Sequence, residues 1–288
     1  MKTKRKQPGL TLTEMTVVIA TIALLFAIGL PAVRVLFNSF ESQSSAQSII
    51  SAALASARAL AAKNQRYAGI RFQKTNQTQQ MLEAAQYMIF IAQDPDMMAY
   101  GFRAVQGIKP IKLPDSVAVS DLTIVTKRNS INPTNSVQVR LDEPALSDQQ
   151  RDNLIDEDRE LTDTTTFSII FSPSGKLVIH GIRARNRDGY PDTSANTFVS
   201  NDDVFNKKAQ VDTGIGIFYQ DDYFGAGGSS YPDLGLGPEQ SRSSFVIYEK
   251  NKFMQAYKRH RAWSDYLVKL VRQVIYINPY TGTIISPD

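Results

Sequence analysis

The sequence places a single carboxylate, Glu14, near the start of an apolar run that is otherwise uncharged. No charged residue occurs from Met15 to Val33, and a helix of that length, at about 1.5 Å per residue, covers roughly 28 Å, close to the thickness of a bilayer's hydrocarbon core. A carboxylate inside such a segment costs a few kcal/mol, so it is expected to have a function and a partner. The chemistry that this pattern predicts is the pairing of Glu14 with a positive charge.

A basic leader precedes the apolar run. Four cations stand within residues 2–6, and an excess of Lys and Arg on one side of an apolar segment sets its orientation in a membrane. We therefore expect residues 10–37 to form a transmembrane helix of a single-pass inner-membrane protein, with the amino terminus in the cytoplasm and the head in the periplasm. Pro31 is expected to kink this helix near its far end.

The segment PGLTLTEMTVVIATIALL resembles the processing site of type IV pilins and type II secretion pseudopilins. The resemblance implies that a prepilin peptidase cuts between Gly9 and Leu10, so that residues 1–9 are a cleaved leader peptide, and that Leu10 is then N-methylated. Leu10 stands where the family usually has phenylalanine. The resemblance also makes Glu14 the subunit-assembly residue. The physics agrees, because the amine freed at Leu10 offers a positive charge, and a buried charge is costly alone and tolerable when paired.

The function that the resemblance implies is structural. The chain would be a minor pilin-like subunit of a type II secretion pseudopilus, which serves protein secretion, or of a type IV pilus. Its expected partners are the prepilin peptidase, other pilin or pseudopilin subunits, the inner-membrane assembly platform and membrane lipid. Neither a cofactor nor catalytic activity is expected. The alternative is a DNA-binding minor pilin for DNA uptake, although the sequence does not favour nucleic acid as the partner.

Composition excludes several kinds of active site. The 288 residues include no cysteine and two histidines, which excludes disulfides, thiolate metal sites and a cysteine nucleophile, and makes a multi-histidine metal centre unexpected. The formal net charge is +4, and removal of the leader with its four cations brings it close to zero. The basic pI is therefore a weak sign of nucleic-acid binding.

Residues 38–66 are expected to continue the helix in amphipathic form, because apolar residues recur there at the spacing of one helical face. These residues are Ala46, Ile49, Ile50, Ala53, Leu54, Ala57, Leu60 and Ala61. Residues 67–288 contain short alternating runs bounded by Pro, Gly and Asn, which favour antiparallel sheet. The predicted fold class is therefore α+β, a long N-terminal membrane-anchoring helix packed on an antiparallel β-sheet head domain. The head has long loop insertions, of which residues 184–242 are expected to be flexible.

Three parts of the predicted head resemble the H-type minor pseudopilins of type II secretion and the related FimT pilin-like proteins. In that group a helix bearing Ala and Arg runs into a strand, a hairpin of the form F-x-P-x-G follows, and a closing strand pair turns at Thr-Gly. Here these parts are Ala57–Arg58–Ala59, Phe171 with Pro173 and Gly175, and Thr281–Gly282. The resemblance covers residues 1–72, about 165–183 and 243–285.

Two acidic patterns are weaker candidates for chemistry. The triplet Asp212–Thr213–Gly214 occurs in aspartic proteases, whose chemistry needs a second, apposed aspartate. Asp192 is the nearest partner, and it does not stand in a second copy of the triplet, so a turn is favoured. The stretch 142–166 offers carboxylates to Ca²⁺ without the spacing of an EF-hand, which favours a solvated loop. Its candidate ligands are Asp152, Asp156, Glu157 and Asp158.

Residues 250–272 mix cations with aromatic side chains. Such a stretch can bind nucleic acid through charge and base stacking. A helix that rests its apolar side on the sheet and leaves its charges in solvent fits the same pattern and is favoured. The residues that would contact DNA are Lys258, Arg259, Arg261, Lys269 and Arg272.

Overall fold

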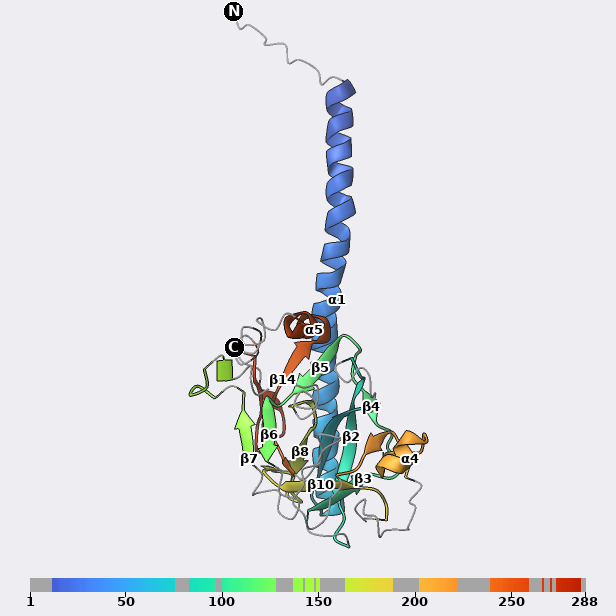
Figure 1. Cartoon of the computed structure of the whole chain (residues 1–288), viewed down its shortest axis with the longest axis vertical. Helices are drawn as coiled ribbons and strands as arrows, with labels where there is room; N and C mark the ends of the chain where they lie inside the picture. Colours follow the sequence, from blue (N-terminus) through green and yellow to red (C-terminus); the bar gives the residue numbers. More distant parts are fainter. Residues whose placement is uncertain are drawn as a thin grey trace, which may run out of the picture. The chain divides into compact units, whose positions relative to one another are not determined.

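The computed structural model divides the chain into two compact units, residues 1–42 and residues 43–288 (Figure 1). Within helix α1, the side chains of residues 12–14, 19 and 22–42 are not described. The residues that the structure describes are 12–75, 83–96, 100–127, 137–141, 143–147, 149–150, 164–188, 202–221, 239–258, 266, 270 and 273–285.

Helix α1 (Leu12–Asn64) is the longest element, with 53 residues. From Gln43 onward it belongs to the second unit, and there it turns one apolar face to the strands. Ile50, Leu54 and Ala57 on that face are fully buried. Because alanine carries little bulk, the strands can approach the helix closely. The apolar residues expected on one helical face are buried or partly buried in this part of the helix.

The main sheet is built around β1 (Ala68–Lys74), which pairs antiparallel with β2 (Gln86–Gln93) on one side and β8 (Phe167–Phe171) on the other. The strand order is β13-β10-β3-β2-β1-β8-β9, and β4 pairs with β2. The remaining bounds are β3 (Gly101–Ala104), β4 (Ile111–Lys112), β9 (Leu177–Val178), β10 (Gly181–Arg185) and β13 (Glu239–Gln240).

The two faces of this sheet are covered by different parts of the chain. On the face that we call the α1 face, Ile70 and Phe72 belong to one hydrophobic cluster with helix α1. On the other, the insert face, Ile91 and Phe102 cluster with aromatic residues of segment 202–221, which we call the inserted segment. The inserted segment contains β11 (Phe205–Asn206), α4 (Lys208–Asp212) and β12 (Phe218–Tyr219).

A smaller sheet has the strand order β16-β15-β14-β5, and its buried side chains contribute to the same core as α1. A short helix, α5 (Lys250–Lys258), follows β14 directly, and its Phe253 packs with Tyr248 and Leu270 in a separate cluster. The strand bounds are β5 (Val117–Ser120), β14 (Ser244–Glu249), β15 (Ile275–Ile277) and β16 (Ile284–Ile285). A separate pair is formed by β6 (Thr123–Lys127) and β7 (Val137–Arg140).

The predicted fold class is wrong. The fold is mostly β, with a curled multi-stranded main sheet, and not a membrane-anchoring helix set on an antiparallel head. The main sheet is also mixed, because β10 runs parallel to β3, and the small pair β11 and β12 is parallel as well. The hairpin expected at Phe171, Pro173 and Gly175 forms between β8 and β9. The chain then crosses from β9, at one edge of the main sheet, to β10, near the opposite edge. Local alternation predicts strands but carries no information on this crossover.

The predicted single-pass location in the inner membrane is also overturned. Crossing a bilayer as a helix takes about 20 consecutive, predominantly apolar residues. In the part of the chain that the structure describes, no helix meets that requirement of length and apolar character.

Parts of residues 184–242 are built into the fold. The inserted segment buries Phe205 and Phe218 completely, and β13 pairs with β10 at the edge of the main sheet. The polar composition that suggested a flexible excursion instead supplies buried hydrogen-bonding groups, which form the site described next.

Candidate functional site

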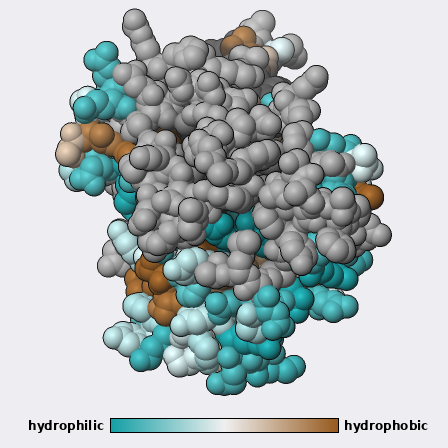
Figure 2. Space-filling model, turned by 60° about the horizontal axis from the view of Figure 1, so that its bottom comes forward, coloured by the Kyte–Doolittle hydropathy of each residue, from teal (hydrophilic) through white to brown (hydrophobic). Residues whose placement is uncertain are grey.

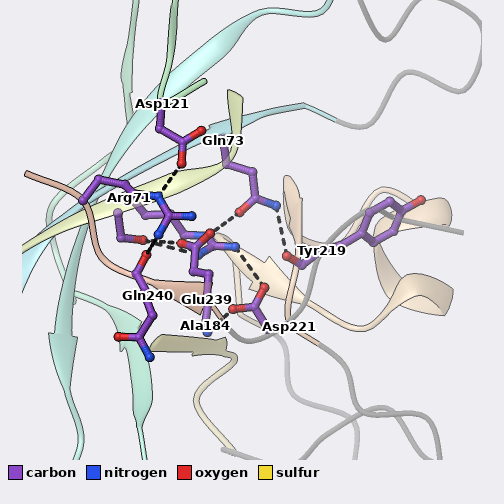
Figure 3. A network of polar contacts seen from close by, with 10 residues as sticks. Arg71, Gln73, Asp121, Ala184, Tyr219, Asp221, Glu239 and Gln240 are labelled. Carbon is purple, nitrogen blue, oxygen red and sulfur yellow. Dashed lines mark hydrogen bonds and ion pairs between the residues drawn. The ribbon is translucent and has the colours of Figure 1, made fainter. Parts of the chain in front are cut away.

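A buried arginine, Arg71, stands at the centre of the insert face. Side chains alternate along a strand, so Arg71 and Gln73 point away from Ile70 and Phe72, which pack toward α1. Arg71 is fully buried. Figure 3 shows its guanidinium surrounded by polar groups from several strands.

Two carboxylates pair with this guanidinium. Its Nη2 lies 2.9 Å from Oδ1 of Asp221, and its Nη1 lies 2.8 Å from Oε1 of Glu239. Arg71 Nε also donates to Oε1 of Gln73 at 2.8 Å. The hydroxyl of Ser168, on the neighbouring strand β8, donates to Oε1 of Glu239 at 2.9 Å. We call Arg71, Asp221 and Glu239 the buried ion group.

The partners of the buried ion group extend across the sheet. Asp221 accepts a 2.7 Å hydrogen bond from the backbone N–H of Ala184 in β10, and Gln73 donates to the backbone carbonyl of Tyr219 in β12 at 3.1 Å. The network therefore joins β1, β8, β10, β12 and β13, whose members are up to 168 residues apart in sequence. It ties the inserted segment to the sheet.

The electrostatics of the group follow from burial. Removal from water raises the pKa of Glu239 to about 7, and the neighbouring charge of Asp221 acts in the same direction, while Arg71 opposes the rise. The carboxyl groups of Asp221 and Glu239 share one guanidinium and are buried away from water. Keeping a proton on one carboxyl group therefore costs less free energy than ionising both.

A second buried pair lies nearby in sequence and space. Arg242, three residues after Glu239, donates its Nε to a carboxylate oxygen of Asp121. Burial raises the pKa of Asp121, and the attraction of Arg242 only partly offsets that effect. Both buried pairs thus fix the β13 region to neighbouring strands through charged groups.

The chemistry that this arrangement supports is structural. The carboxylates of the buried ion group are held by the guanidinium and by hydrogen bonds, and they are removed from solvent. Among the described residues, no group of three or more His, Asp or Glu side chains is placed to hold a metal ion. The group is therefore best understood as a cross-link that positions the inserted segment.

The three parts of the chain that carry the H-type resemblance meet at Arg58 of α1. Its Nε donates to the backbone carbonyl of Gly175 at 2.8 Å, and its Nη1 donates to that of Thr281 at 2.9 Å. Gly175 and Gly282 both have positive φ angles, 75° and 69°, which favour glycine. A Cβ atom at either position would lie 3.2 Å from an Arg58 side-chain atom, so Arg58 would have to move by a few tenths of an ångström to make room for it.

Most of the sequence-predicted site residues fall outside the described part of the structure. The cleavage position Gly9–Leu10 lies outside it, and so do the calcium candidates Asp152, Asp156, Glu157 and Asp158 and the DNA-contact candidates Arg259, Arg261, Lys269 and Arg272. Glu14 and Pro31 lie within α1 and Lys258 ends α5, but their side chains are not described. The helix continues through Pro31, and the kink there stays a prediction.

The aspartic-protease triplet has a local structural setting. Asp212 ends the short helix α4, and its Oδ1 accepts a 2.7 Å hydrogen bond from the hydroxyl of Tyr219. Asp192, the aspartate considered as its partner, lies outside the described residues.

Sequence reasoning missed the buried ion group. One signal was present, because Arg71 stands at the middle of β1, AGIRFQK, where alternation directs its side chain to the face opposite Ile70 and Phe72. Asp221 and Glu239 gave no such signal, since both stand in a stretch rich in Asp, Gly and Ser that is typical of loops.

Comparison of the chain with models of known protein families, with curated proteins and with solved structures finds no match.

Proposed function

We propose that this chain is a minor pilin-like structural subunit, cut by a prepilin peptidase between Gly9 and Leu10 and assembled into a type II secretion pseudopilus or a type IV pilus. The observation that carries the proposal is an apolar surface near the start of α1. The side chains of Met15, Val17 and Val18 are 57%, 65% and 50% exposed in the single chain.

Exposed aliphatic side chains on a helix gain stability when another helix covers them. Burial of apolar surface is worth about 25 cal/mol per Å², and like helices pack side by side through ridges and grooves. A filament in which the first part of α1 packs against the same part of other copies would bury Met15, Val17 and Val18. The resemblance of this segment to pilin processing sites points to the same arrangement.

The contacts of Arg58 lend support from the head. The resemblance rests on three short motifs that are distant in sequence, and the arginine of the first motif donates hydrogen bonds to the turns of the other two. Motifs that form one structural unit are less easily explained by chance than motifs scattered over a surface.

In the proposed filament, Glu14 of one subunit neutralises the amine at Leu10 of its neighbour. Either charge alone would be costly within packed helices, so the pair also fixes the axial position of each new subunit. Replacement of Glu14 by Ala is expected to reduce incorporation into filaments while leaving cleavage after Gly9 unchanged.

The absence of cysteine from the sequence allows a direct test, because one introduced cysteine is then unique. Val17→Cys is expected to form disulfide-linked dimers when intact filaments are treated with a mild oxidant. Ala59→Cys is the matched control, since Ala59 is exposed on α1 within the second unit. Filaments that contain the Val17→Cys subunit but give no cross-linked product above the Ala59→Cys level would contradict helix-to-helix assembly.

The DNA-binding alternative is not proposed. Its candidate contacts lie outside the described residues, apart from Lys258, of which only the backbone is described.

A further inference from the structure

Two adjoining hollows lie beside β3, and no member of the buried ion group lines either of them. Their cavity volumes are about 380 Å³ and about 430 Å³. Both are lined by the stretch Ala104–Gln106, which follows β3, and by Arg187, which follows β10, so the two hollows share a wall. The face of the molecule that Figure 2 brings forward is mostly hydrophilic over its described residues, with small hydrophobic areas among them.

The first hollow is cationic. Arg66, Arg103 and Arg187 line it together with uncharged side chains, and none of its described lining residues is a carboxylate. Three arginines come from three different parts of the chain: the residues after α1, strand β3 and the residues after β10. Arg103 and Arg187 also have carboxylate partners, which balance part of this charge. A guanidinium has five N–H donors, so the donors that remain can hold an anion with charge-assisted hydrogen bonds.

Local structure explains how two of these arginines are placed. After α1 ends, Gln65 adopts a left-handed conformation with a φ angle of 53°, and the N–H of Arg66 donates back to the carbonyl of Ala61 at 3.3 Å. This helix cap turns Arg66 out of the helix direction. Arg103 is held from one side, because its Nη1 lies 2.9 Å from Oδ2 of the buried Asp94.

Arg187 is held more loosely. Its Nε lies 3.7 Å from Oδ2 of Asp202, and its Nη2 lies 3.5 Å from Oδ1 of Asp203, both long for a hydrogen bond. The side chain of Arg187 is 48% exposed. Because these contacts are long and the side chain is half exposed, Arg187 retains N–H donors that can reach an anion in the first hollow.

The second hollow has apolar residues in its walls and charged residues of both signs, because Lys109 and Arg187 line it together with Asp202 and Asp203. Ile108 and Ile217 are each 39% exposed there, and Val204 also lines it. Asp203, whose side chain is 83% exposed, would repel a second acidic group placed in this half. The joined hollows thus offer three guanidinium groups at one end and an aliphatic surface beside acidic and basic side chains at the other.

We propose that the joined hollows bind a short acidic segment of a partner protein, in which side-chain carboxylates stand directly beside one bulky aliphatic residue. The carboxylates lie against Arg66, Arg103 and Arg187, and the aliphatic side chain lies against Ile108 and Ile217. This site goes beyond the proposed filament function and does not depend on it.

The test uses the purified full chain and a capped, fluorescently labelled peptide of sequence Ser-Glu-Glu-Leu-Ser, followed by fluorescence anisotropy. Saturable binding is expected, with an affinity that falls as salt rises, because part of the interaction is between exposed charges. A peptide with Gln in place of both Glu residues, and a peptide with Ser in place of Leu, are each expected to bind at least tenfold more weakly.

Protein variants then locate the site. Arg66→Gln combined with Arg187→Gln is expected to weaken binding of the acidic peptide at least tenfold, and Ile108→Ser is expected to weaken it several-fold. Lys63→Gln is the matched control, since Lys63 is an exposed cation of the last turn of α1 that lines neither hollow. The replaced residues are all exposed, so thermal unfolding should change little in each variant.

Several results would overturn the proposal. Failure of the acidic peptide to saturate the chain at low salt would do so, and so would equal binding of the Gln-substituted peptide. An unchanged affinity in the Arg66→Gln, Arg187→Gln variant would show that any binding occurs elsewhere. In a last case, inorganic phosphate displaces the peptide at a concentration similar to that of the peptide itself, while the Leu-to-Ser peptide and the Ile108→Ser variant bind normally. That combination of results would indicate a simple anion site and contradict the peptide proposal.

Discussion

The two faces of the main sheet are covered by different physical means. On the α1 face, a regular helix places a row of small and aliphatic side chains against Ile70 and Phe72. On the insert face, a short irregular segment contributes two aromatic anchors, Phe205 and Phe218, and is tied down by the buried ion group. Apolar packing has little directional preference, whereas an ion pair with hydrogen bonds requires one geometry.

This difference suggests a division of roles. The α1 face supplies most of the apolar burial, which stabilises the domain in proportion to area. The insert face buries charges, and a buried ion pair adds little net stability relative to apolar replacements. We infer that the buried ion group contributes mainly by fixing where the inserted segment lies, and four predictions probe that comparison.

The largest effect is expected from Arg71→Ala. It leaves Asp221 and Glu239 buried without their cation, and breaking a buried pair in this way costs about 3–5 kcal/mol of unfolding free energy. Denaturant unfolding measures the loss. The surface pair Lys112–Asp115, with side chains 47% and 77% exposed, is the matched control, and Lys112→Ala should change the unfolding free energy little. Similar losses for the two variants would show that the buried ion group has no special weight.

A slightly smaller loss is expected from Leu54→Ala on the α1 face. Leu54 is fully buried, and truncation of a buried leucine costs about 3 kcal/mol, partly through the cavity that it leaves. Ile179→Ala is the control, because Ile179 is 60% exposed and its truncation should change stability little. The inserted segment should remain protected from protease in Leu54→Ala but not in Arg71→Ala. Cleavage of both variants at the inserted segment would contradict the proposed division of roles between the two faces.

The third prediction concerns pH. The ordinary pKa of a glutamate is 4.5, and burial raises that of Glu239 to about 7, so between these values the folded chain holds a proton that the unfolded chain has released. This contribution to stability is complete below pH 4.5 and is lost as the pH rises through 7, by up to about 3 kcal/mol. Glu239→Gln keeps an acceptor for Arg71 and Ser168 but does not titrate.

Unfolding free energies of Glu239→Gln measured from pH 4.5 to 8 should therefore decline less than those of the unaltered chain. Some decline should remain, because burial also raises the pKa values of Asp121 and Asp202, which act with the same sign. Parallel pH profiles for the two proteins would exclude Glu239 as the source of the effect.

The smallest effect is expected from Arg58→Ala. It removes two charge-assisted hydrogen bonds to backbone carbonyls, which together are worth about 1–3 kcal/mol in a partly exposed setting. Thermal unfolding of the variant measures this. Arg58→Lys should restore only part of the loss, since one ammonium group does not match the fork that reaches both Gly175 and Thr281. Full rescue by lysine would argue that charge alone matters there.

Sequence patterns predict the buried contacts of the α1 face better than those of the insert face, for a physical reason. The spacing from Ala46 to Ala61 identifies the buried side of the helix, and alternation identifies β1, β2 and β8, because both patterns repeat over adjacent residues. Arg71 pairs with Asp221 and Glu239, which lie 150 and 168 positions away in the sequence, and such contacts have no periodic pattern. No local pattern encodes such pairs.

Two other predictions failed for related reasons. The apolar run after the leader predicted a membrane-spanning helix, and the described residues contain none. The short alternating runs predicted an antiparallel sheet, and β10 instead crosses over to run parallel to β3. Local hydrophobicity and alternation report on individual segments, whereas the way segments join depends on contacts made only in the folded chain.

The central claim, that this chain is processed and assembled as a pilin-like subunit, is tested most directly by the mass of its mature amino terminus. Intact-mass and amino-terminal peptide mass spectrometry of the protein purified from its native cells should find a chain that begins at Leu10, and Gly9→Glu should abolish that species. A native protein that retains residues 1–9 would contradict the account.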